Sequence, residues 1–242
     1  MNRHETSLRK TSQINREFSM TNNTAKAFDL SQVDEAEHLI PRPFGTLQTL
    51  NLDHLYRYAF AKSFCYNANV LDAAMGCGYS SLVLNCKHYT GVDIDANMVA
   101  FANENYRPII PNSTYLQGSL LDLQVKSHTI DTFISFETIE HLPVADLGKY
   151  FAEIKRTLRP GGIFLCSTPI YRGDKIGLLT KYHHFEFRFG QFEATLLSHG
   201  FQLLETWYQW PPYFTIQPVI PSAAQTQQVV PFIVVCVCRF PG

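Results

Sequence analysis

The sequence predicts an α/β fold: a Rossmann-like, doubly wound sheet, mostly parallel, with an antiparallel closing strand. Short apolar strand segments alternate with helix patterns from Asn69 onward, which favours a parallel sheet covered by helices on both faces. A turn containing Gly76 and Gly78 follows the first strand, where open α/β sheets bind ligands. A proline-rich loop without a helix pattern joins the last two strands, so we expect these strands to pair antiparallel.

Composition narrows the class of protein. The 242 residues suit one α/β domain with additions, and 45% hydrophobic against 17% charged residues is typical of a chain with a full core. A net charge of −1 lacks the basic excess of nucleic-acid binders, so nucleic acid is not an expected partner. The longest apolar stretch, Val229–Cys238, is too short to span a bilayer. The polar N-terminus and six scattered cysteines without a CxxC pair predict a cytoplasmic protein without membrane insertion.

The chain divides into three predicted segments. Residues 1–27 are polar and predict a disordered tail. Residues 28–66 predict a helical lid or cap, in which Arg57 and Tyr58 either reach a bound ligand or lie on the surface. Residues 67–242 form the predicted ligand-binding α/β domain, whose motifs are described below. The apolar spacing of the cap helix predicts that one face is buried, formed by Leu52, Leu55, Tyr56, Ala59, Phe60 and Phe64.

Apolar runs and helical periodicity place the remaining elements in order. The predicted strands are Val70–Ala73, Tyr89–Ile94, Thr114–Gln117, Ile130–Phe136, Ile163–Ser167, Phe201–Tyr208 and Val229–Phe240. The predicted helices are Ser80–Cys86, Asn97–Asn105, a segment from Leu147 to Leu158, and Gln191–His199.

The glycine-rich turn favours a cofactor with an amino-acid part. Glycines allow positive φ and a close approach of the backbone to a ligand. Asp93 ends the second strand about 20 residues after Asp72, where an acid can bind a ribose diol. A dinucleotide site would place a third glycine where Ser81 stands and has no need of Asp72. The Asp72 carboxylate would bind an ammonium group or organise the turn.

These motifs resemble class I methyltransferases. Val70–Gly78 resembles their motif I, Gly91–Asp95 their second motif, Ile130–Leu142 their fourth-strand motif, and Leu158–Leu165 the turn into their fifth strand. The resemblance covers roughly Leu39 to Phe201. It implies S-adenosylmethionine as cofactor. The cofactor-binding positions that it implies are Asp72, Ala74, Gly76 and Gly78 for the methionine part, Asp93 for the ribose, Ser119 and Leu120 for the adenine, and Ser135.

Three further segments resemble a narrower group, bacterial methyltransferases of the ubiquinone O-methyltransferase-like type, which often act on small molecules or glycans. These segments are His54–Phe60, Ser135–His141 and His183–Phe187. Many relatives carry Asp where this chain has Ser119, so the adenine contact departs from the pattern.

An acid-histidine group follows the fourth strand, where the methyl group of the cofactor is expected. We expect His141 to act as the general base, because its ordinary pKa suits neutral pH. Glu137 and His183 complete the expected catalytic set. The alternative is that His141 forms local hydrogen bonds only.

The same segment resembles the metal-binding set of small-RNA 3′-terminal ribose 2′-O-methyltransferases. The candidate ligands are Glu137, Glu140, His141 and His183, a mixed set compatible with Mn²⁺ or Fe²⁺. The Glu-x-x-Glu-His string also occurs in metal-free relatives, and this chain lacks a basic surface signature, so we expect no metal.

The sequence therefore predicts a methyltransferase that transfers a methyl group to an oxygen, with nitrogen as second choice, of a small-molecule or glycan-type acceptor. Two alternatives stay open: a metal-dependent RNA ribose 2′-O-methyltransferase, and a noncatalytic cofactor-binding subunit. The sequence gives no indication of oligomeric state.

Overall fold

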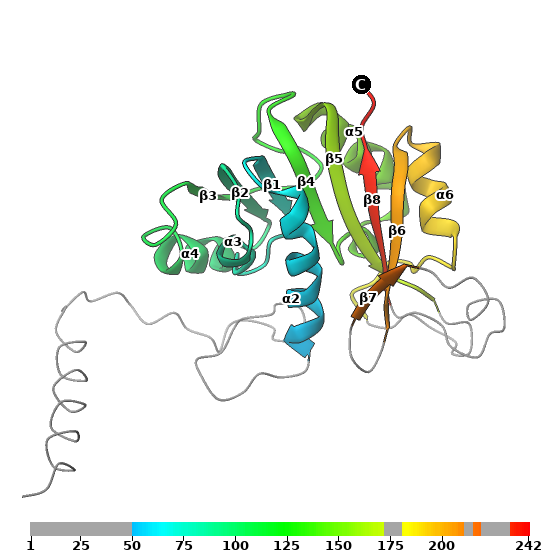
Figure 1. Cartoon of the computed structure of the whole chain (residues 1–242), viewed down its shortest axis with the longest axis horizontal. Coiled ribbons are helices and arrows are strands. Elements are labelled where there is room, and N and C mark those ends of the chain that lie inside the picture. The colour runs from blue at the N-terminus through cyan, green and yellow to red at the C-terminus, as the bar shows by residue number, and fades with distance from the viewer. Residues whose placement is uncertain (1–49, 172–180, 211–214, 219–232) are drawn as a thin grey trace, which may run out of the picture. The chain divides into compact units, whose positions relative to one another are not determined.

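One eight-stranded sheet organises the protein (Figure 1). The computed structural model describes residues 50–171, 181–210, 215–218 and 233–242, which belong to a single compact unit. The predictions for the N-terminal tail and for residues 28–49 lie outside the described residues. The strands are β1 Asn69–Ala73, β2 His88–Asp93, β3 Ser113–Gln117, β4 Ile130–Phe136, β5 Leu158–Pro169, β6 Gln202–Trp210, β7 Thr215–Pro218 and β8 Ile233–Arg239.

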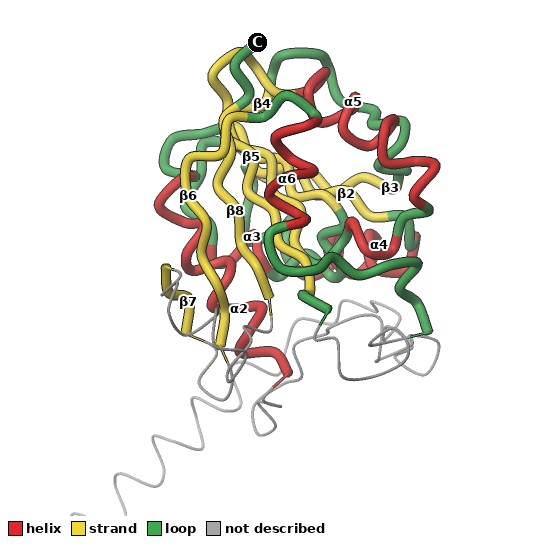
Figure 2. The backbone as a smooth tube through the Cα atoms, turned by 90° about the vertical axis from the view of Figure 1, so that its right-hand side faces the viewer, coloured by secondary structure: helices red, strands yellow, loops and turns green. Residues whose placement is uncertain are grey.

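The strand order β3-β2-β1-β4-β5-β8-β6-β7 confirms the predicted fold class. Strands β1 to β5 pair in parallel, as the alternation with helices predicted. Strand β8 lies between β5 and β6 and is antiparallel to both (Figures 1 and 2). The antiparallel closing strand is therefore confirmed.

The edge strand β7 lies within the segment expected to be a loop. It pairs antiparallel with the end of β6, and Trp207 pairs with Pro218. A proline is tolerated at this position because an edge strand has one side without a hydrogen-bonded neighbour. This strand could not be predicted from the sequence, because four residues that include a proline are too few to show the alternating pattern of a strand.

Helices cover both faces of the sheet. They are α2 Leu50–Ala61, α3 Ser80–Val83, α4 Ala96–Asn105, α5 Leu147–Thr157 and α6 Gln191–Ser198. Side chains on successive residues of a strand point to opposite faces, so Phe133 of β4 packs in the core under α5 and α6, and Ile134 packs under α2 and α4. Within the described residues, no helix is long and apolar enough to cross a membrane.

The buried face of α2 differs from the predicted one. Leu55 is 39% exposed and Tyr56 is 47% exposed, whereas Arg57 and Tyr58 are buried. The prediction was wrong for Leu55, for Tyr56 and for Ala59, which is also exposed. The alternative that Arg57 and Tyr58 lie on the surface was wrong too. Tertiary hydrogen bonds explain the difference, because Arg57 Nη1 donates to Gln209 Oε1 of β6 at 2.5 Å, and the Tyr58 hydroxyl donates to Asp72. The spacing of apolar residues does not reveal that a polar side chain is buried by hydrogen bonds to distant residues.

Candidate cofactor and acceptor site

The turn between β1 and α3 has three residues in the left-handed region. Ala74 has a φ of 57°, Gly76 of 56° and Gly78 of 79°. A Cβ on Gly78 would lie 3.0 Å from Cβ of Ala102 and 3.1 Å from Cε1 of Tyr115. A Cβ on Gly76 would meet nothing within 4 Å. Gly78 therefore allows the turn to pack closely on the protein, and Gly76 leaves space beside the backbone at the carboxyl end of β1.

Asp72 is fully buried beneath this turn. Its carboxylate accepts hydrogen bonds from the hydroxyls of Ser80 at 2.5 Å, Tyr89 at 3.0 Å and Tyr58 at 3.3 Å. Burial raises the pKa of Asp72 to about 6, although the three hydrogen bonds act in the opposite direction. Of the two roles expected for Asp72, these contacts support organising the turn, because they connect β1, β2, α2 and α3.

Asp93 connects the end of β2 to the glycine-rich turn. One carboxylate oxygen accepts the Gly76 N–H at 2.8 Å, and the other accepts the Asp95 N–H at 2.9 Å. The side chain is almost buried. A carboxylate oxygen has two lone pairs, so an aspartate in this position can hold the turn and accept a hydrogen bond from a ribose hydroxyl. The structure thus brings Asp93 and Gly76 together, as the spacing of the motifs suggested.

The acid-histidine group follows β4. Glu137 has a φ of 50°, a conformation that is uncommon for a residue with a side chain. Its N–H donates to the Ser167 carbonyl at 3.1 Å, and its carboxylate accepts the Ser167 hydroxyl at 2.7 Å. Glu140 and His141 lie in a 3₁₀-helix, Ile139–His141. The turn at Glu137 is thereby held against the neighbouring strand β5.

His183 comes from a later segment and lies against this turn. The rings of His141 and His183 pack edge to face, with centroids 4.9 Å apart. The His184 N–H donates to the Glu140 carbonyl at 2.8 Å, which fixes the two segments together. One ligand-type atom each from Glu140, His141 and His183 lies within 4.8 Å of the others. Glu137, the fourth residue of the predicted metal set, does not belong to this group.

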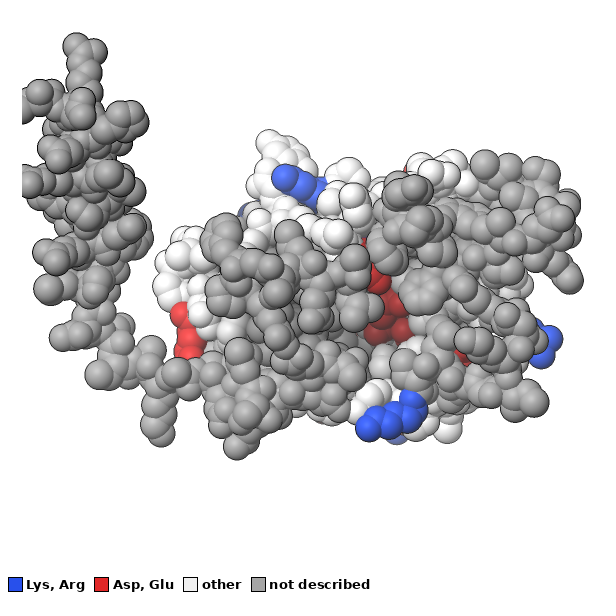
Figure 3. Space-filling model, turned by 90° about the horizontal axis from the view of Figure 1, so that it is seen from below, with Lys and Arg blue, Asp and Glu red and all other residues white. Residues whose placement is uncertain are grey.

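Burial and mutual repulsion set the charge of this group. Burial and the nearby His183 lower the pKa of His141 to about 4, so its ring is neutral near pH 7. Burial and the Glu137 carboxylate hold the pKa of Glu140 well above its ordinary value. Burial also raises the pKa of Glu137. Figure 3 views the protein from below, and a few acidic side chains of described residues are visible near the middle of this view.

Several residues that contact this group were not predicted from the sequence to belong to the site. Thr168 Oγ1 donates to Glu140 Oε2 at 2.9 Å, and Glu186 Oε1 lies 2.8 Å from Nδ1 of His183. Ser167 and Thr168 belong to β5; Ser167 was predicted only as the last residue of a strand, and Thr168 lay outside that prediction. Their proximity to β4 could be inferred from the parallel pairing, but the direction of each side chain could not.

The loop after β3 carries the expected adenine contacts. Ser119 accepts the Leu121 N–H at 3.1 Å, and the preceding Gly118 N–H donates to the Asp93 carbonyl at 2.9 Å. Leu120 is partly buried against the core. The loop thus starts beside Asp93.

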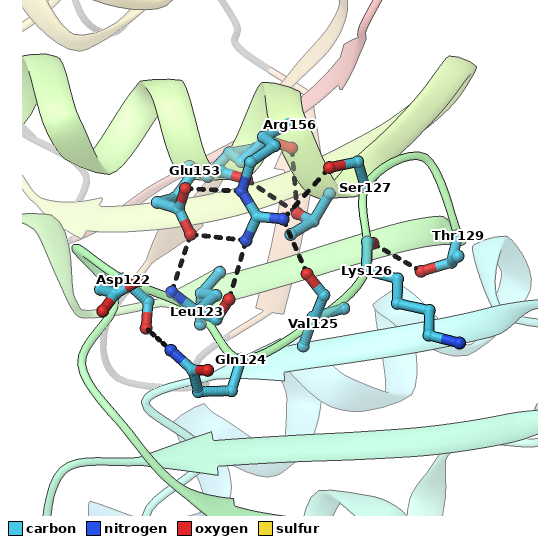
Figure 4. Close-up of polar contacts among 11 residues, drawn as sticks. Asp122, Leu123, Gln124, Val125, Lys126, Ser127, Thr129, Glu153 and Arg156 are labelled. Atoms are coloured by element: carbon cyan, nitrogen blue, oxygen red, sulfur yellow. Dashed lines mark hydrogen bonds and ion pairs between the residues drawn. The ribbon is translucent and has the colours of Figure 1, made fainter.

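Helix α5 holds the remainder of this loop (Figure 4). Arg156 forms an ion pair with Glu153 and donates to the carbonyls of Leu123 and Val125 at 2.8 and 2.7 Å. Glu153 also accepts the Leu123 N–H at 2.7 Å.

The Ser135 side chain lies on the opposite side of the sheet from the Tyr58 contact with Asp72. Its hydroxyl is buried and accepts a hydrogen bond from Tyr150 of α5 at 2.7 Å. Its side chain therefore lies on the α5 face of the sheet, whereas Tyr58, which contacts Asp72, packs on the opposite face.

Comparison with known proteins supports the class that the fold and this site define. Residues 71–166 match a protein family described as "Methyltransferase domain". This part of the chain is thus similar to a methyltransferase domain, and the sheet that contains it has a Rossmann-like arrangement.

Two relatives and one solved structure are informative. The chain is 29% identical over 147 residues to a "probable S-adenosylmethionine-dependent methyltransferase" of Mycolicibacterium smegmatis, covering 59% of this chain and 55% of the relative. It is 27% identical over 115 residues to a fatty-acid O-methyltransferase of the same species, covering 46% and 43%. The chain thus spans about half the length of these relatives. The crystal structure of the [4+2]-cyclase SpnF aligns with a TM-score of 0.61 at 16% identity, covering 79% of this chain and 80% of that one, which shows a shared fold.

Proposed function

We propose that this protein is an S-adenosylmethionine-dependent methyltransferase acting on an oxygen, with nitrogen as second choice, of a small-molecule or glycan-type acceptor. The observation that carries the proposal is the hydrogen bond from the Gly76 N–H to the Asp93 carboxylate. It joins the open side of the glycine-rich turn to the acid at the end of β2, so one ligand can contact both.

In this proposal the cofactor lies across the carboxyl ends of β1 and β2. Asp93 binds the ribose hydroxyls, and the backbone at Gly76 faces the methionine part. The Arg57 guanidinium binds the methionine carboxylate. Arg57 is fully buried and lies 3.7 Å from the Asp53 carboxylate, and its Nε and Nη2 atoms have no hydrogen-bond partner among the described residues, so they are available to a second anion. The adjacent Tyr58 already contacts Asp72 beneath the turn.

The acceptor side of the proposed site is formed by Glu137, His141 and His183. Methyl transfer is an in-line displacement at a sulfonium, so the protein must position the acceptor and remove a proton from a hydroxyl. A base is most effective when its pKa is near the working pH. The pKa of His141 is lowered to about 4, so its ring is a weak base, and burial raises the pKa of Glu137 from its ordinary value toward the working pH. We therefore assign proton removal to Glu137 and acceptor positioning to the two histidines.

The acceptor class rests on two supports. One relative is named a fatty-acid O-methyltransferase, which favours oxygen as the methylated atom. A net charge of −1 lacks the basic excess of nucleic-acid binders, which disfavours the alternative of an RNA substrate.

Two measurements test the proposal. Calorimetry with S-adenosylhomocysteine should show binding of one equivalent, and NAD should give no signal. Release of S-adenosylhomocysteine from S-adenosylmethionine should then be followed over a panel of fatty acids, phenols, sugars and amines. Preferred binding of NAD would overturn the cofactor assignment. Cofactor binding without turnover on any acceptor would favour the noncatalytic subunit, and the same fold in a [4+2]-cyclase makes this turnover assay essential.

A further inference from the structure

The side chains of Glu140, His141 and His183 converge on one another. Their ligand-type atoms lie within 4.8 Å of one another. Glu140 is fully buried, and its Oε1 atom has no hydrogen-bond partner in the part of the chain that the structure describes. A buried carboxyl oxygen without a partner is unfavourable, so a ligand that binds this oxygen would stabilise the site.

Each of the three side chains also forms a hydrogen bond with a residue outside the group. Thr168 donates to the second oxygen of Glu140. The ring of His141 is hydrogen-bonded to the backbone of Tyr182. Protein metal sites have this arrangement, in which an outer partner orients each ligand and fixes the tautomer of each imidazole.

The outer partner of His183 is a carboxylate. Glu186 bonds to Nδ1 of His183, and the side chains of both residues are nearly buried. This contact leaves Nε2 of His183 for a ligand at the centre of the group. A carboxylate that accepts from the imidazole makes the ring a stronger metal ligand.

We propose that Glu140, His141 and His183 form a binding site for a divalent transition-metal ion. Two imidazoles and one carboxylate suit Zn²⁺, Fe²⁺ or Co²⁺ better than Mg²⁺, whose usual ligands are all oxygen. Three protein ligands leave coordination positions for an acceptor oxygen, as in catalytic metal sites. This role toward the acceptor rests on the proposed function, whereas binding of the ion does not.

The geometry requires a small contraction. Metal–ligand distances of about 2.1 Å in a tetrahedral site place ligand atoms about 3.4 Å apart. The present upper limit is 4.8 Å, so the longest pair has to close by roughly 1.4 Å, which small side-chain rotations can supply. The inference departs from the expectation of no metal, which rested on the occurrence of the motif elsewhere and not on geometry.

Binding of Co²⁺ provides the test, because its visible absorption reports coordination by protein ligands. Chelator-treated protein without an affinity tag should bind one equivalent of Co²⁺, and Zn²⁺ should displace it while excess Mg²⁺ does not. Glu140→Gln and His183→Asn should each weaken Co²⁺ binding at least tenfold. The matched control His88→Asn, which changes a half-buried histidine of β2, should bind Co²⁺ like the unchanged protein.

Three outcomes would overturn the proposal: no saturable binding, equal binding by the Glu140→Gln variant, or a thiolate-to-metal absorption band, which would place the ion on cysteines. Circular dichroism and calorimetry with S-adenosylhomocysteine should accompany each variant. If His183→Asn fails to fold, the near-isosteric Glu140→Gln carries the test. Failure of S-adenosylhomocysteine to bind the unchanged protein would count against the proposed function and leave the Co²⁺ result standing.

Discussion

The Ser80 hydroxyl donates a 2.5 Å hydrogen bond to the Asp72 carboxylate, and this contact connects the first residue of α3 to the end of β1. Ser80 also lies 2.8 Å from the Tyr89 hydroxyl, which itself donates to Asp72. A buried network of this kind is stable only while each member keeps its partner. The shape of the glycine-rich turn therefore depends on a carboxylate without contact to solvent.

Replacing Asp72 by Asn should change how stability depends on pH. Because the pKa of Asp72 is raised from 3.8 to about 6, the folded state binds an extra proton between these values. Its contribution is fully present below about pH 4 and is lost as pH rises through about 6. The difference corresponds to about 3 kcal/mol. Urea unfolding at several pH values should show a steeper decline between pH 4 and 6 for the unchanged protein than for Asp72→Asn, since other buried acids contribute equally to both.

Parallel pH profiles for the two proteins would contradict the assignment of this titration to Asp72.

Alanine at the two glycines of the turn should have different effects. Gly76→Ala places its Cβ in open space, so it should cost about 1–2 kcal/mol for the left-handed conformation and sharply reduce cofactor affinity. Gly78→Ala brings the same backbone strain and contacts with Ala102 and Tyr115, so its stability loss should be larger. Urea unfolding and calorimetry with S-adenosylhomocysteine measure the two effects. Wild-type affinity in a folded Gly76→Ala protein would remove this backbone from the cofactor site.

Asp93→Ala should weaken cofactor binding by about 1.5–3 kcal/mol, because hydrogen bonds to a charged group are lost. The control is Asp95→Ala, which removes the side chain that caps α4 by accepting the Asn97 N–H. This control should lower stability by about 1 kcal/mol and leave affinity nearly unchanged. Titration calorimetry with S-adenosylhomocysteine compares the two variants. If the Asp93→Ala and Asp95→Ala variants bound S-adenosylhomocysteine with equal affinity, Asp93 would not bind the ribose.

Arg156→Met should loosen the loop that follows β3. The variant loses donors to the Leu123 and Val125 carbonyls and the ion pair with Glu153, so we expect a stability loss of about 1.5–3 kcal/mol. Lys149→Met changes an exposed residue of the same helix and should alter stability by less than about 0.5 kcal/mol. Hydrogen exchange should quicken at residues 123–129 in the Arg156 variant alone. Unchanged exchange there would show that Arg156 does not hold the loop.

Local patterns made much of the fold predictable. The strand Ile130–Phe136 was predicted with its observed bounds. A short, mostly apolar segment between polar residues is typical of a strand that helices cover on both faces. The glycine-rich turn was equally clear, because left-handed conformations at Gly76 and Gly78 depend on the residue type itself. Helix α3 was predicted to reach Cys86 but ends at Val83, where Leu84 turns to an extended conformation so that the chain returns to β2.

The sequence by itself determined the alternation of strands and helices, the position of the turn and the acid at the end of β2, because each of these follows from residue types close together along the chain. Only the tertiary structure decided which face of α2 is buried, since the partner of Arg57 is Gln209, far away on β6. It also decided that His183 meets Glu140 and His141 while Glu137 turns to Ser167. These contacts depend on side-chain directions between segments that only the folded sheet brings together.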